Sequence, residues 1–126
     1  MFANLLPLLS RLPDPTPYTS NRTQTLKSFQ SIEWTLQHAQ PTLPYNQLLT
    51  LAYTTFAASL NLPTPSDAEA QAFGAKIGDW PALPDTVAAL KVLKKHYRLV
   101  FLSNVDNASI RRTITGPLEG ADIDAV

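Results

Sequence analysis

The sequence predicts an α/β fold in two parts, a helical first part over residues 1–76 and a partial core with strands over residues 77–126. Apolar residues recur at helical spacing through the first part, and prolines separate its segments. In the second part, Leu99–Leu102 is apolar without alternation and directly follows a predicted helix. Such a run is typical of a strand that is buried on both faces of a parallel sheet.

Four helices are expected in the first part. A short leucine-rich helix ends at Pro13–Pro17, where three prolines in five residues predict a rigid loop without helix. The next two helices begin near Asn21 and at Pro44, and each carries apolar residues at helical spacing along one face. Ser66 and Glu69 have the Ser-x-x-Glu spacing of a capping box, which predicts the start of a fourth helix.

The second part is expected to alternate helices with strands. Asp85 is a candidate N-cap for a helix whose buried face follows Val87–Tyr97. The basic run Lys91–His96 could be a nucleic-acid patch, but it fits better as a solvated face, since cations stabilise the C-terminal end of a helix. Asp106 is predicted to cap the next helix, and Ile123–Val126 has the composition of a second strand.

Composition narrows the classes of function. The chain has 126 residues, of which 44% are hydrophobic and 16% charged, so it can bury a core. Ten basic and ten acidic residues give a formal net charge of zero, which favours neither nucleic acid nor an anionic membrane as a partner. Cysteine is absent and there are only two histidines, so we expect no disulfide, no thiolate catalysis, no metal site and no cofactor.

No apolar segment is long enough to span a bilayer. The apolar stretch Phe2–Leu12 has no basic leader and no clear cleavage site of small residues, so it does not fit a secretory signal peptide. A cytoplasmic location is therefore expected.

The candidate site lies at the carboxyl end of the predicted strand, where Ser103 and Asn104 follow Leu99–Leu102. Ligands of open α/β sheets bind at the carboxyl ends of strands. A hydroxyl and an amide, together with backbone N–H groups of the next helix, can hold an anion there. The alternative is structural, because many strands end in a polar pair that caps local backbone groups.

The segments Leu83–Lys91, Leu99–Asn104 and Ala108–Ile110 together resemble the haloacid dehalogenase superfamily. The shared pattern is a helix that begins with Pro-Asp, a buried strand that ends in Leu-Ser-Asn, and a following helix. The closest likeness is to the 2-haloacid dehalogenase branch in the form common among fungi, where Ile77–Pro81 also has a counterpart. The helical first part resembles the cap of this branch. The implied fold is a helical cap with a partial Rossmann-like core.

The resemblance implies hydrolysis of the carbon–halogen bond of a small 2-haloacid. In that family a strand-end aspartate attacks carbon, and water hydrolyses the resulting ester. Ser103 matches the residue that binds the carboxylate of the substrate, and Asn104 matches the residue beside it. Arg22 is the nearest match to the arginine that holds the leaving halide, but it could equally be an exposed surface arginine.

The sequence also departs from the family pattern. The nucleophile motif Asp-x-x-x-Thr after an apolar strand is absent, and the family's lysine and final acidic motif are missing, as if the chain were truncated at both ends. No catalytic residue is therefore assigned, and we expect the chain as given to be inactive. The alternatives are an inactive truncated product, a non-catalytic binding protein, and a relative recruited to a step of fungal secondary metabolism.

Two partners are expected. One is a small-molecule carboxylate at Ser103. The other is a second copy of the chain, because a strand at Leu99–Leu102 without its neighbour would present an apolar edge that pairs with another strand.

Overall fold

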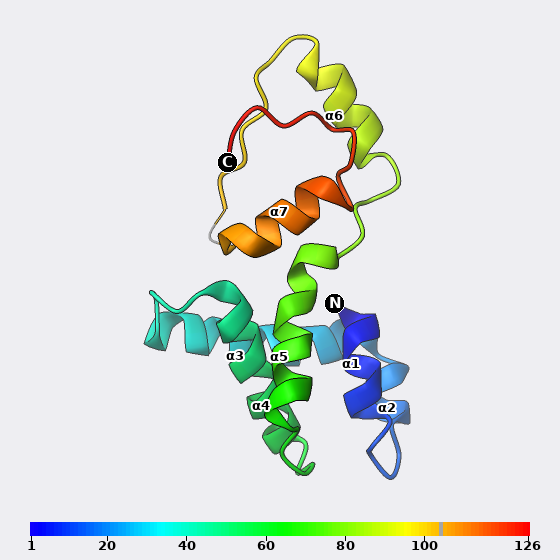
Figure 1. Ribbon diagram of the computed structural model, residues 1–126. Helices are drawn as coiled ribbons and strands as arrows, with labels where there is room; N and C mark the ends of the chain where they lie inside the picture. Colours follow the sequence, from blue (N-terminus) through cyan, green and yellow to red (C-terminus); the bar gives the residue numbers. More distant parts are fainter. Residues whose placement is uncertain (104) are drawn as a thin grey trace. The chain divides into compact units, whose positions relative to one another are not determined.

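The protein divides into two compact units, Met1–Gly74 (unit 1) and Ala75–Val126 (unit 2). The computed structural model describes residues 1–103 and 105–126. Helices account for 61% of the described residues (Figure 1). Unit 1 is built from α1 (Phe2–Leu9), α2 (Thr16–Thr19), α3 (Arg22–Ala39), α4 (Tyr45–Ser59) and α5 (Asp67–Ala75), the last of which ends at the boundary.

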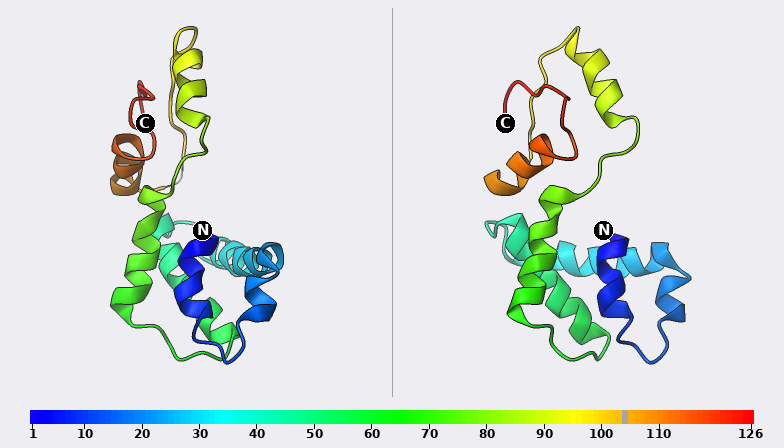
Figure 2. Two further views of the ribbon diagram at one scale, coloured as in Figure 1. Left: turned by 90° about the vertical axis from the view of Figure 1, so that its right-hand side faces the viewer. Right: turned by 45° about the vertical axis from the view of Figure 1, so that its right-hand side comes forward.

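Aromatic side chains from three helices form the centre of unit 1. Phe29 of α3 makes edge-to-face contacts with Phe56 of α4 and Phe73 of α5, with ring centroids 5.5 and 5.6 Å apart. Tyr53 of α4 stacks on Phe73 at 4.4 Å. Such pairs add to the burial of their large apolar areas. Leu5, Leu8 and Leu9 of α1 are also fully buried, so α1 contributes to the core of unit 1. Figure 2 shows the helices of unit 1 grouped together.

Local sequence signals set the helix starts in unit 1. The side chain of Asn21 accepts a hydrogen bond from the Gln24 N–H at 3.1 Å and so caps α3. Ser66 accepts from the Glu69 N–H at 3.2 Å, which is one half of the predicted capping box. The other half does not form, because the Glu69 carboxylate binds Arg11 and Tyr53 instead.

The Pro13–Pro17 segment was expected to be loop, and this expectation is wrong in its second half. Helix α2 begins at Thr16, with proline in its first turn. Proline is compatible with a first turn because the N–H that it lacks has no partner within the helix there.

Unit 2 contains the short 3-10 helix η1 (Lys76–Asp79) and the helices α6 (Thr86–Lys94) and α7 (Asn107–Thr115). Its buried apolar side chains, among the described residues, are Ile77, Ile110, Leu118 and Ala121. Helix α7 packs on η1.

The predicted α/β fold class, with a partial Rossmann-like core, is wrong. The described residues contain no strand or sheet. Leu99–Leu102 and Ile123–Val126 meet in one isolated parallel bridge, between Val100 and Ala125. An extended segment needs neighbours to form a ladder, and the side chain of Leu102, which was expected to be buried, is 99% exposed.

The predicted buried face of α6 is also not buried. No residue of α6 is buried, and Leu93 and Tyr97 are 44% and 65% exposed. The apolar spacing of this helix is helical as predicted, but the residues described in unit 2 provide no layer that covers it.

Candidate functional site

Ser103 follows the first extended segment of unit 2, as the sequence predicts for the candidate site. Its side chain is exposed, and its hydroxyl accepts a hydrogen bond from the Val105 N–H at 3.2 Å. This bond closes a local turn of the kind that serine commonly makes. Asn104, the second predicted site residue, lies outside the described residues.

The two extended segments of unit 2 are joined by backbone and side-chain bonds. The Phe101 N–H donates to the Ala125 carbonyl at 2.9 Å, and the Asp124 N–H donates to the Leu99 carbonyl at 2.8 Å. The Asp124 carboxylate accepts from the Leu99 N–H at 2.7 Å and pairs with Lys94 at 2.5 Å. The Lys94 ammonium and the Leu99 N–H hold the pKa of Asp124 below its usual range. Asp124, which belongs to the second segment, therefore links α6 and the first segment to it.

An open apolar hollow of about 290 Å³ lies between α6 and these segments. Its lining is mostly aliphatic and aromatic and includes one cation; the residues are Leu90, Arg98, Leu99, Val100, Phe101 and Ile123. The hollow and the exposed side chains of α6 have the same cause, namely incomplete packing of the helix against the segments.

The N-terminus of α7 already holds an anion. The Asp106 carboxylate accepts a hydrogen bond from the Ser109 N–H at 2.9 Å, so the predicted N-cap is confirmed. Burial acts to raise the pKa of Asp106, but the bonds from Ser109 and neighbouring backbone groups outweigh it and hold the pKa below its usual range. Because Asp106 is charged at neutral pH, it disfavours a substrate carboxylate at this helix end.

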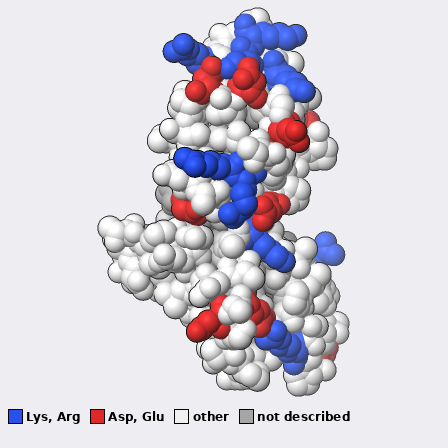
Figure 3. Space-filling model, viewed as in Figure 1, with Lys and Arg blue, Asp and Glu red and all other residues white. Residues whose placement is uncertain are grey.

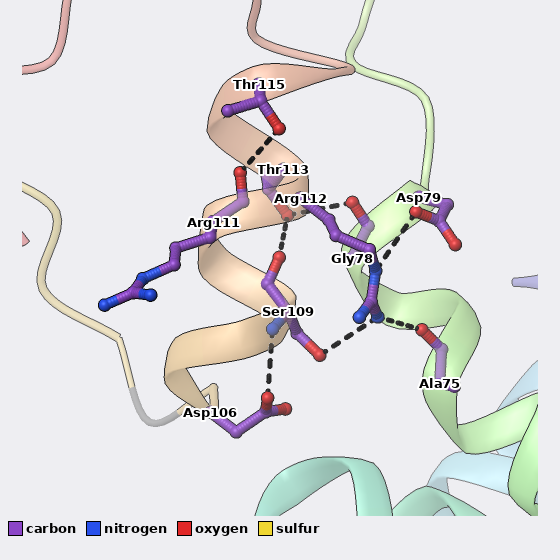
Figure 4. Close-up of polar contacts among 9 residues, drawn as sticks. All are labelled: Ala75, Gly78, Asp79, Asp106, Ser109, Arg111, Arg112, Thr113 and Thr115. Atoms are coloured by element: carbon purple, nitrogen blue, oxygen red, sulfur yellow. Dashed lines mark hydrogen bonds and ion pairs between the residues drawn. The ribbon is translucent and has the colours of Figure 1, made fainter.

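A polar cluster joins η1 to α7, and its key residue is Arg112 (Figure 4). The guanidinium donates to the Ala75 carbonyl and lies 3.3 Å from the Asp79 carboxylate and 3.4 Å from the Ser109 hydroxyl. Gly78 makes this approach possible, because a Cβ there would lie 2.8 Å from the guanidinium and 2.9 Å from the Ser109 carbonyl. Figure 4 shows the neighbouring Arg111 directed away from the cluster.

Arg22, the third predicted site residue, lies in unit 1. Its guanidinium carbon lies 5.2 Å from the centre of the Phe2 ring, which is a cation–π contact. Within unit 1 this contact joins α3 to α1.

A second polar cluster, also in unit 1, surrounds Glu69. One oxygen of the Glu69 carboxylate accepts from Arg11 at 2.6 Å and from the Tyr53 hydroxyl at 2.7 Å. The bonds from Arg11 and then Tyr53 lower the pKa of Glu69. Burial, followed by the bond to Glu69, raises the pKa of Tyr53. The cluster ties the segment after α1 to α4 and α5, which is a structural role.

Neither the distribution of charged side chains nor the grouping of potential metal ligands indicates a further site among the described residues. On the face shown in Figure 3, basic and acidic side chains lie side by side and form no continuous patch of one sign. Within residues 1–103 and 105–126, no three His, Cys, Asp or Glu residues are grouped in a way that could hold a metal ion. In the same residues, no helix has the length and apolar character needed to cross a membrane.

The sequence predicted the Asp106 cap, which is confirmed, and Ser103 as a site residue, which stays a prediction, but it did not indicate Arg112. The motif that contains Gly78 and Asp79 was noticed, yet nothing in it identifies a partner 33 positions away. The chain matches no known family model, and no curated protein sequence matches it significantly. The haloacid dehalogenase resemblance therefore stays a prediction that depends on the motifs quoted above.

Proposed function

We propose that this protein is a non-catalytic relative of the haloacid dehalogenase-type hydrolases, located in the cytoplasm, that binds another polypeptide in extended conformation along Leu99–Leu102. One observation carries the proposal. The parallel pairing uses backbone groups of Leu99 and Phe101, whereas the alternate residues Val100 and Leu102 are 66% and 99% exposed. Addition of a strand to such an edge is a common mode of peptide recognition.

Three of the aspartates of unit 2 support the non-catalytic part of the proposal. Asp79 pairs with Arg112, Asp106 caps α7, and Asp124 binds Lys94 and the Leu99 N–H. A nucleophilic carboxylate must face its substrate with a cation or hydrogen-bond donors arranged for the transition state. Each of these three carboxylates has an oxygen engaged in a contact that holds the fold, and the second oxygen of Asp106 is buried without a hydrogen-bond partner among the described residues.

The binding proposal is tested with a synthetic β-favouring peptide of alternating valine and threonine, flanked by lysines. Titration into ¹⁵N-labelled protein should shift the amide signals of Val100 and Leu102 more than those of Leu99 and Phe101. This alternation is expected because neighbouring residues of an extended chain direct their N–H groups to opposite edges. A matched peptide with proline at its central position should bind more weakly. Unchanged amide signals at Val100 and Leu102 would overturn the proposal.

A second candidate is the family-level hydrolysis of a 2-haloacid, with the small-molecule carboxylate bound at Ser103. One observation favours it. Ser103 lies directly after a segment that pairs in parallel with a later one, and α7 lies between the two in sequence. Halide release from 2-chloropropionate by purified protein decides between the candidates. Turnover that is lost in Ser103→Ala would support the hydrolase and contradict the non-catalytic proposal.

A further inference from the structure

The backbone of Leu99–Leu102 is bonded along one edge. The Leu99 carbonyl and the Phe101 N–H bond to the segment that contains Asp124 and Ala125, and the Leu99 N–H bonds to the Asp124 carboxylate. In an extended chain, the N–H and C=O of one residue point to the same edge, and successive residues alternate. The N–H and C=O groups of Val100 and Leu102 therefore face the opposite edge. Within the described residues, no backbone hydrogen bond occupies them.

The outward N–H and C=O groups of this edge in one copy can bond to the same groups in a second copy. If two copies pair in antiparallel orientation about an axis through Phe101, Val100 of each copy lies opposite Leu102 of the other. Each of these residues offers one donor and one acceptor, so the two pairs can exchange hydrogen bonds without displacing any bond already made. A two-fold axis uses the same surface on both copies, which is the commonest symmetry of protein dimers.

The charges beside the edge favour the same orientation. Arg98 is exposed and precedes the edge. Parallel pairing would bring the Arg98 side chains of the two copies together, whereas antiparallel pairing separates them. The formal net charge of zero adds no repulsion between copies.

We infer that the polypeptide bound along Leu99–Leu102 is a second copy of this chain, paired antiparallel through Val100 and Leu102. The inference rests on the proposed function and names its partner. The paired stretch is short, so the dimer is weak and forms in a concentration-dependent way.

Sedimentation velocity of the full chain over a wide concentration range tests the inference. The unmodified protein should move from monomer to dimer as its concentration rises. Leu102→Pro removes one outward N–H per copy at an exposed position, so it should raise the dissociation constant about tenfold or more.

Val92→Lys is the matched control, because Val92 is 57% exposed on α6 of the same unit but lies outside the edge. It should leave the dissociation constant unchanged. Equal loss of association in Val92→Lys and Leu102→Pro would show nonspecific apolar contact and overturn the inference. A monomer at every concentration would also overturn it. If the valine–threonine peptide still shifted Val100 and Leu102 in that monomer, the proposed function would stand and only the self-pairing would fail.

Discussion

Unit 1 buries its apolar side chains, whereas unit 2 leaves many of them in solvent. In unit 1 the large hydrophobic residues that are exposed, among those described, are Leu6 and Trp34. In unit 2, with fewer residues, the exposed ones are Leu83, Val92, Leu93, Tyr97, Val100, Leu102 and Val126. Exposed apolar surface on this scale is typical of an interaction site. In the comparison, the apolar side chains of unit 1 cover one another, whereas those of unit 2 stay exposed, which is consistent with the proposal that unit 2 binds a partner.

For Val100, Leu102 and Val126 the difference follows from where each unit finds its hydrogen bonds, whereas Val92 and Leu93 are exposed because no layer of the described residues covers α6. A helix satisfies its backbone internally, so the helices of unit 1 need only apolar faces that meet, and these meet at Phe29, Phe56 and Phe73. An extended segment must find partners in another segment. In unit 2, Leu99–Leu102 finds a partner on one edge.

The largest expected effect concerns the core of unit 1. Phe29→Ala removes a fully buried ring that contacts Phe56 and Phe73, so it should lower the free energy of unfolding by about 3–5 kcal/mol. Urea denaturation followed by the helical circular dichroism signal measures it. Leu102→Ala, at a 99% exposed position of unit 2, should change the same quantity by less than about 0.5 kcal/mol. A small effect of Phe29→Ala would contradict a closed core in unit 1.

The next effect concerns the polar cluster that stabilises unit 2. Arg112→Ala removes the bonds to the Ala75 carbonyl and Ser109 and the ion pair with Asp79, and should lower the stability of unit 2 by about 1–3 kcal/mol. The indole fluorescence of Trp80, the one tryptophan of unit 2, reports this in a background with Trp34→Phe.

Arg111→Ala is the control for this prediction. Arg111 lies on the same helix as Arg112, but its side chain is directed away from the cluster (Figure 4). Its effect should stay within about 0.5 kcal/mol. If the two arginine variants unfold alike, the cluster does not hold η1 to α7.

Helix starts could be predicted because the information for them is local, although the predicted cap Asp85 makes no side-chain cap bond to α6. The starts of α3 at Asn21 and of α7 at Asp106 need only the residues within one turn. The fold class could not be predicted in this way. The apolar run Leu99–Leu102 fits a buried strand, but whether it joins a sheet depends on neighbours far away in sequence.

For the candidate site too, only the local features could be predicted from the sequence. The position of Ser103 directly after the apolar run is a local feature and was found from the sequence. Its exposed hydroxyl and the bond from the Val105 N–H depend on the conformation of the turn. The Arg112 cluster depends on the approach of η1 to α7, and no periodicity encodes that approach.

The N-caps Asn21 and Asp106 allow a comparison of the two units, because in each the side chain accepts one backbone hydrogen bond. Asn21→Ala and Asp106→Ala each remove one side-chain acceptor at a helix start, and each should lower stability by about 1 kcal/mol. Trp34 in a Trp80→Phe background reports unit 1, and Trp80 in a Trp34→Phe background reports unit 2. If the units unfold independently, each cap variant should shift only its own probe. A shift of both probes by either variant would show that the units unfold together.

The smallest expected effect is the loss of stability of unit 1 in acid that follows from protonation of the Glu69 carboxylate. Arg11 and Tyr53 lower the pKa of this carboxyl, so the folded state binds its proton less readily than the unfolded state does. The resulting stability is fully present above the unfolded pKa of glutamate, about 4.3, and is lost as the pH falls through the lower folded pKa. The side chain of Glu69 is 28% exposed and that of Arg11 39%, so the contribution should stay below about 1 kcal/mol.

A double-mutant cycle of Glu69→Gln with Arg11→Ala, measured by urea denaturation at neutral and at acid pH, isolates the pair. The coupling energy should be favourable at neutral pH and should vanish in acid. A coupling that persists in acid would show that Arg11 and Glu69 interact through contacts that do not depend on the charge of Glu69. These two side chains would then belong to the packed core of unit 1.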